Sequence, residues 1–116
     1  MKKITIISIL LLSILSMGYS DSLTRKIVGT WYRSESDILK FKEDGTGKEK
    51  TAWGIKEFKW KIKMLNNGQF TIYVEILNPG KYEESSMESN PIQQTATEIK
   101  SISFGKYKYN KLDSDF

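Results

Sequence analysis

Residues 58–63 alternate strictly between apolar side chains and lysines, and this alternation restricts the possible folds more than any other feature of the sequence. Phe58, Trp60 and Ile62 point to one side of an extended chain, while the lysines point to the other. A period of two residues is typical of a strand that packs one face on a core and exposes the other to water. Residues 70–76 alternate in the same way and follow an Asn-Gly pair, which favours the tight turn of a hairpin. The sequence therefore predicts an antiparallel sheet.

Shorter stretches of the same kind predict the other strands. The period of two begins near residue 28, and a glycine turn follows at Asp44 and Gly45. Residues 81–94 are rich in charged and polar side chains, which predicts either a solvated loop or a weak, exposed hairpin. About seven or eight short strands fit into a chain of this length, so we predict an all-β fold that forms a small antiparallel meander barrel or a partly open barrel. The predicted strands start near residue 28 and continue at residues 39–42, 48–51, 58–63, 70–76, 95–101, 102–104 and 106–112.

The start of the chain has a different character from the rest. Two lysines precede an apolar run over residues 4–17, and the small residues Gly18 and Ser20 follow it. This order is typical of a secretory signal peptide, and the apolar run is shorter than the roughly 20 residues of a membrane-spanning helix. We therefore expect a cleaved signal peptide at residues 1–20 and one domain at residues 21–116. The mature protein is then predicted to be soluble, exported to the periplasm or the cell exterior, and free of a membrane span.

The composition argues against several classes of function. The chain has 18 basic and 14 acidic side chains, which is too balanced for a dedicated nucleic-acid-binding domain. It has no histidine and no cysteine, so it lacks the groups for a Ser-His-Asp or Cys-His site, for zinc ligation by these residues, and for disulfides. Its adjacent carboxylates fall in a predicted turn and a polar stretch, where a general acid would not be buried. We expect a protein that is not an enzyme, with no catalytic residues, metal or cofactor, and we expect a monomer.

Three motifs follow one another along the first half of the predicted domain. They are Gly29-x-Trp31, then Phe41-x-x-Asp44-Gly45-x-Gly47, then Phe58-x-Trp60-x-Ile62. Their order and spacing resemble those of small bacterial secreted lipocalin-like domains of the calycin type. The resemblance implies that Gly29, Trp31, Asp44, Gly45 and Gly47 are structural residues of a β-barrel.

The resemblance also implies a position for Trp31. In such domains this residue packs across the closed end of the barrel, and a basic side chain of the last strand lies over its ring. In this sequence Lys106, Lys108 and Lys111 are available for that contact, and Arg33 is an alternative on the same strand as Trp31.

Two functions are compatible with such a barrel. In the first, the barrel holds a small hydrophobic ligand, and residues 81–94 close its mouth. The ligand would lie against the inward-facing side chains Phe41, Phe58, Trp60, Phe70, Ile72 and Val74. In the second, these side chains fill the barrel, and its loops bind a protein partner as an interaction or inhibitor module. A barrel of about eight strands is barely wide enough for one small ligand, so the volume inside it decides between the two functions. In both cases we expect Tyr107 and Tyr109 at the rim or on the outer face.

Overall fold

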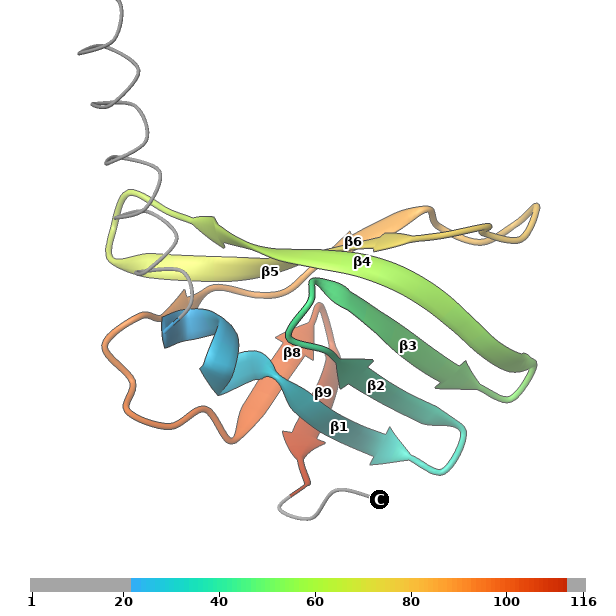
Figure 1. The fold of residues 1–116 in the computed structure, drawn as a ribbon, viewed down its shortest axis with the longest axis horizontal. Helices are drawn as coiled ribbons and strands as arrows, with labels where there is room; N and C mark the ends of the chain where they lie inside the picture. Colours follow the sequence, from blue (N-terminus) through green and yellow to red (C-terminus); the bar gives the residue numbers. More distant parts are fainter. Residues whose placement is uncertain (1–21, 113–116) are drawn as a thin grey trace, which may run out of the picture.

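The computed structural model describes residues 22–112. The predicted signal peptide and its cleavage site lie outside these residues. In the described part, a short helix at residues 22–27 is followed by nine strands that belong to one antiparallel sheet (Figure 1). The strands are β1 (Gly29–Ser34), β2 (Asp37–Phe41), β3 (Thr46–Thr51), β4 (Gly54–Met64), β5 (Gln69–Ile76), β6 (Ser86–Glu88), β7 (Ile92–Gln93), β8 (Ser101–Phe104) and β9 (Tyr107–Lys111).

The sheet curls into a barrel that is closed except along one seam. Strands β1 to β5 form a meander in which each strand pairs with the next, and β9 returns to pair with β1. β8 lies beyond β9, while β6 and β7 both pair with β5 at the opposite end of the sheet. Asn90 bridges the seam: its N–H donates to the Ser103 carbonyl (2.8 Å), and its side-chain amide exchanges two hydrogen bonds with Gly105 (3.0 and 3.3 Å). The prediction of a small, partly open antiparallel barrel is confirmed.

The strand predicted at residues 95–101 is wrong except for its last residue, where β8 begins. The preceding residues form an irregular segment at the end of the barrel where the helix lies. Ile99 is buried in the core and Ala96 packs against it from the same segment. Because these two apolar residues are three positions apart, they do not follow the period of a strand.

Residues 81–85 belong to an exposed loop, as predicted, but residues 86–94 form neither a free loop nor a hairpin of their own. Both β6 and β7, which lie within this segment, pair with β5. Ser89 lies between them and is buried, and its hydroxyl oxygen accepts the N–H of Ile72 at 2.8 Å. This part of the segment therefore contacts β5 along its length despite its polar composition. Residues 77–85 extend from the sheet as an exposed loop.

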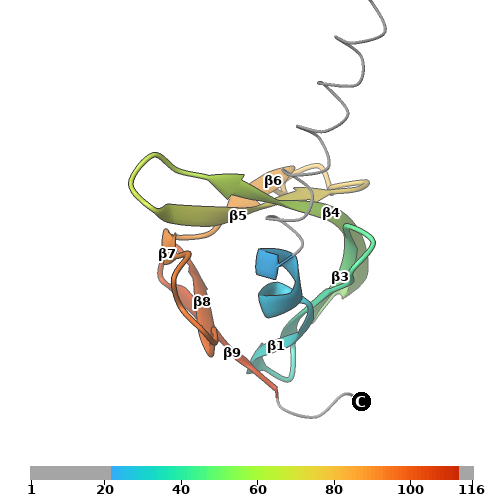
Figure 2. The ribbon, with the colours of Figure 1, turned by 60° about the vertical axis from the view of Figure 1, so that its left-hand side comes forward.

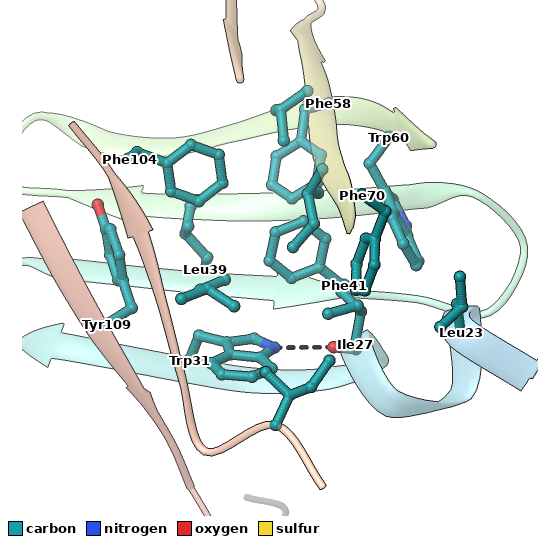
Figure 3. Packing of buried hydrophobic residues seen from close by; sticks show 14 of the residues in the cluster. Leu23, Ile27, Trp31, Leu39, Phe41, Phe58, Trp60, Phe70, Phe104 and Tyr109 are labelled. Atoms are coloured by element: carbon teal, nitrogen blue, oxygen red, sulfur yellow. Dashed lines mark hydrogen bonds between the residues drawn. The ribbon is translucent and has the colours of Figure 1, made fainter. Parts of the chain in front are cut away.

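The register of the strands places aromatic rings beside glycines inside the barrel. Phe41 lies opposite Gly29 on one side and Gly47 on the other, and Phe58 lies opposite Gly47 and Ile76. A Cβ atom at Gly47 would collide with the Phe58 ring and with a backbone carbonyl, so only glycine leaves room for this ring. The rings can therefore meet in the single buried core that Figure 3 shows.

The helix at residues 22–27 lies within one end of the barrel and closes it (Figure 2). Its last residue, Ile27, is buried, and the Ile27 carbonyl accepts the indole N–H of Trp31 at 2.7 Å (Figure 3). The Lys111 ammonium lies 5.4 Å from the centre of the Trp31 ring and donates to the Lys26 carbonyl at 2.9 Å. Trp31 is thus held at this closed end between the helix and a lysine of the last strand.

Candidate functional site

The six residues predicted to line a ligand site lie in the core of the barrel. Five of them are almost completely buried, and Trp60 is only 6% exposed. The Phe41 ring lies 5.3 Å from the Phe58 ring and 5.1 Å from the Trp60 ring, centre to centre, so the aromatic groups pack against one another. Phe70, Ile72 and Val74 face them from β5 as part of the same cluster. Whether these residues also contact a ligand stays a prediction.

Trp60 has a second partner besides the core. Its indole N–H is within hydrogen-bonding distance of the Lys42 carbonyl (2.9 Å) and the Thr46 carbonyl (3.0 Å), which flank the turn between β2 and β3. Its backbone N–H donates to the Gly45 carbonyl at 2.9 Å. The polar atom of the indole therefore holds this turn on β4.

The glycine turn itself is built from local contacts. The Asp44 carboxylate accepts the backbone N–H of Thr46 (3.0 Å) and its hydroxyl (2.6 Å), and these bonds lower the pKa of Asp44. Gly45 has a φ of 85°, in the left-handed region that glycine adopts without strain. The residues of this motif therefore have a structural role in the turn.

The end of the barrel away from the helix is its mouth, which we define by the turns β1–β2 and β3–β4 and the loop of residues 77–85 (Figure 1). Strand register places Glu49 on the inner face there, because it lies opposite the buried Leu39 of β2. On its other side Glu49 lies opposite Lys56 of β4, so two charged residues are neighbours at the mouth. Burial raises the pKa of Glu49, and the carboxylates of Asp37 and Glu83 raise it further against the opposing effect of Lys56. The mouth therefore holds a half-buried carboxylate directly above the apolar core.

Asp37 anchors the other side of the mouth. Its carboxylate accepts the Tyr109 hydroxyl at 2.7 Å and an Arg33 N–H at 2.8 Å. Burial and this hydrogen bond raise the pKa of Tyr109, so the phenol stays protonated. Tyr109 is 5% exposed and faces the interior, contrary to its predicted position at the rim, whereas Tyr107 is partly exposed beneath the Arg33 guanidinium, 4.5 Å from it. Tyr109 lies opposite the buried Ile102 of β8, and its ring packs edge-on against the Phe104 ring at 6.1 Å between centres.

A hollow of about 360 Å³ opens between these charged groups and the β5–β6 side of the mouth. Its charged walls include Glu49 and an ion pair between Lys56 and Glu83, which lowers the pKa of Glu83. Its apolar walls are Trp53, Ile76 and Met87. Trp53 is 94% exposed at the tip of the β3–β4 hairpin, so this large aromatic side chain is available to a partner.

Sequence reasoning did not identify Asp37, Glu49 or Trp53 as candidates. The alternation of the strands gives a signal for two of them, because alternate residues point to the same face. Asp37 alternates with Leu39 and Phe41, and Glu49 alternates with Gly47. Trp53 has no such signal, since its exposure depends on the hairpin that carries it. Within residues 22–112, no group of three or more acidic side chains is arranged to hold a metal ion.

Comparisons with known proteins provide no relative from which to transfer a function. No family model, no curated protein and no solved structure matches this chain. The resemblance to lipocalin-like domains therefore stays a prediction that depends on the three sequence motifs. In the part of the chain that the structure describes, no helix is long and apolar enough to cross a membrane.

Proposed function

We propose that this chain is an exported, non-enzymatic protein-interaction module, in which the barrel is a scaffold and the mouth binds a protein partner. The observation that carries the proposal is that the inward-facing aromatic side chains contact one another, while a hollow with an exposed tryptophan lies at the mouth. A carrier of an apolar ligand needs the reverse arrangement, with an apolar space inside and a closable entrance.

The chemistry of the mouth favours a partner that presents a basic side chain next to apolar groups. Carboxylates outnumber basic groups there, since Glu49, Glu83 and Glu84 line the hollow together with Lys56 alone. Trp53 and Tyr82 are both more than 90% exposed, on the β3–β4 hairpin and the loop of residues 77–85. Exposed aromatic groups beside carboxylates provide cation–π contacts and large buried area on binding, which is how interface hot spots are built.

A substitution that enlarges a core side chain tests the scaffold. Val74 is completely buried among the aromatic rings. If the barrel is packed, Val74→Phe lowers the free energy of unfolding by about 1–3 kcal/mol, the usual cost of overpacking. If the barrel contains a space for a ligand, the larger side chain fills it and stability is unchanged or higher. Ile55→Phe, on the exposed outer face, is the control and changes stability by less than about 0.5 kcal/mol.

A second experiment tests the mouth. The protein is immobilised and exposed to the proteins exported by the cell that makes it, in parallel with the double variant Trp53→Ser, Tyr82→Ser. Both side chains are almost fully exposed, so the variant keeps its fold and loses only the binding surface. A partner retained by the wild type and by a Met64→Ser control, but not by the double variant, supports the proposal. Equal retention by all three proteins contradicts it.

A further inference from the structure

A second hollow, of about 600 Å³, lies on the outer face of β1 to β4, on the opposite side of the sheet from the core. We call it the outer groove. Its apolar surface comes from Tyr32, Ile38, Ile55 and Leu112. Its charged surface comes from Lys40, Lys48 and Lys50, with Glu35 as the single acidic side chain. The volume is within the range of pockets that bind discrete ligands or side chains.

The outer groove has a row of residues across four strands, in which β1, β2 and β4 contribute apolar side chains and β3 contributes a lysine. Tyr32 on β1 lies opposite Ile38 on β2, Ile38 lies opposite Lys50 on β3, and Lys50 lies opposite Ile55 on β4. Strands are about 4.8 Å apart, so the row is about 14 Å long. Ile55, at the β4 end of this row, is 67% exposed, so its aliphatic side chain is open to solvent. The face thus offers a line of apolar contacts that this domain leaves open to solvent.

The neighbouring row, two residues away on each strand, has a basic pair at its centre on β2 and β3. Lys40 on β2 lies directly opposite Lys48 on β3, and Lys50 lies next to them on the same face. Like charges directly opposite each other destabilise a sheet. Glu57, across from Lys48, offsets only part of this charge. An anionic group bound over the pair would remove the repulsion, so the basic row favours an acidic ligand.

We propose that the outer groove binds an acidic amphipathic segment of a partner protein. The apolar row would accept the apolar side chains of the segment, and its carboxylates would lie over Lys40 and Lys48. A helix with apolar side chains at positions i, i+4 and i+8 spans about 12 Å, which matches the row from Tyr32 to Ile55. This site is separate from the mouth, and its partner has the opposite charge.

Two other occupants fit the groove less well. A second copy of the chain, bound through the same face by two-fold symmetry, would set this patch against an identical one, and the three lysines against one glutamate in each patch would give a net repulsion. An anionic bilayer would attract the lysines, but a flat surface does not fill a hollow with an apolar row at its base. Both alternatives are outcomes of the experiment below.

The test uses a fluorescent 14-residue helical peptide with leucines at every third or fourth position and glutamates on both sides of the leucine stripe. A counterpart with lysine in place of each glutamate controls for the apolar contacts. We expect saturable binding of the acidic peptide in fluorescence anisotropy and none of the basic one. Lys40→Glu, Lys48→Glu weakens binding by about tenfold or more, because repulsion replaces attraction at the site. The matched control Lys59→Glu, Lys61→Glu, on the same outer face of β4 but outside the groove, changes the affinity by less than about threefold.

Several results would overturn the proposal. Equal weakening by the two charge-reversed pairs would mean that the peptide senses only the overall charge of the face. No saturable binding at about 200 μM peptide, with all proteins folded by circular dichroism, would remove the site. Binding to vesicles of phosphatidylcholine and phosphatidylglycerol, without binding to the peptide, would assign the face to a membrane, and peptide-dependent dimerisation would assign it to a second copy. The mouth variant Trp53→Ser, Tyr82→Ser must leave the peptide affinity unchanged, which separates this result from the test of the proposed function.

Discussion

The two ends of the barrel are built from the same strands, yet they differ in almost every physical property. At the closed end, β1, β2 and β3 contribute Trp31, Phe41 and Gly47 to an apolar core that a helix covers. At the mouth, β2 and β3 contribute Asp37 and Glu49 to the same inner face. Four positions along β2 therefore separate Phe41, whose side chain stabilises the fold, from Asp37, whose charge is costly to bury.

This difference indicates which end of the barrel stabilises the fold and which end is suited to binding a partner. Two polar groups of the core at the closed end serve the fold: the Trp31 indole donates to the helix, and the Trp60 indole holds a turn. Polar groups at the mouth are only partly compensated, since Glu49 is half-buried and has a raised pKa. A region with unfavourable buried charge beside an exposed aromatic side chain is better suited to binding a partner than to stabilising the barrel.

The largest expected effect is at the closed end. Trp31→Ala should lower the free energy of unfolding by about 3–5 kcal/mol, because it removes a completely buried indole, its bond to Ile27 and its contact with Lys111. Urea unfolding measures the change. The matched variant at the mouth, Trp53→Ala, should lose less than about 0.5 kcal/mol because its side chain is already in water. A loss below about 1 kcal/mol in Trp31→Ala would mean that the closed end does not stabilise the fold more than the mouth does.

A smaller effect is expected from one added methyl group at Gly47. Gly47→Ala places a Cβ against the Phe58 ring and the Lys40 carbonyl, and the backbone atom cannot move without shifting β2. We expect a loss of about 1–3 kcal/mol in urea unfolding, the range for overpacked sites. Lys48→Ala, at the next residue on the outer face, is the control and should change stability little. Equal values for the two variants would mean that the core has room next to this glycine.

The closed end was largely predictable from the sequence because its signals are local. The period of two, the glycines of the turns and the spacing between Gly29 and Trp31 each act over a few residues, and they determine which side chains face inward. The strand predicted over residues 95–101 failed for the opposite reason. Ile99 is buried by contacts with distant elements, and an apolar residue in an irregular segment has no period that marks it.

The mouth was not predictable in the same way. Residues 48–50 read Lys-Glu-Lys, and the single local sign that Glu49 faces inward is its spacing of two residues from Gly47, which has no side chain. The pairing of β3 with both β2 and β4 shows that Glu49 lies opposite Leu39 inside the barrel. The hollow also needs the loop of residues 77–85, which supplies Glu83 from a distant part of the chain. Contacts of this kind depend on the tertiary structure, so a pattern of alternation does not reveal them.

A moderate effect at the mouth tests whether any of its polar contacts stabilise the fold. Tyr109→Phe keeps the ring in the core and removes the hydroxyl that donates to Asp37 at 2.7 Å. We expect a loss of about 1.5 kcal/mol, the lower end of the range for a hydrogen bond to a charged group, because Asp37 keeps Arg33 as a second partner. Tyr107→Phe, on the partly exposed ring two residues earlier, is the control. A loss as large as that of Trp31→Ala would show that the mouth supports the barrel as strongly as the closed end does.

The smallest expected effect is a gain in stability when the charge of Glu49 is removed. The pH dependence of this gain tests whether the mouth differs from the closed end. Burial and the carboxylates of Asp37 and Glu83 raise the pKa of Glu49 above its ordinary value of 4.5 in the folded protein. The folded state then binds a proton more readily than the unfolded state, so the wild type loses stability as pH rises from about 4.5 through the raised pKa, and the loss persists at neutral pH.

Glu49→Gln removes this charge and should therefore raise the free energy of unfolding at pH 7. The gain should shrink as pH falls through the raised pKa and disappear well below pH 4.5, where Glu49 is protonated in both states. Urea unfolding at several pH values measures it, with Glu57→Gln on the exposed outer face as the control that shows no such gain. Partial exposure of Glu49 and screening by salt keep the effect small. A loss of stability at pH 7 in Glu49→Gln would mean that Lys56 compensates the charge fully, and the mouth would then be a structural element like the closed end.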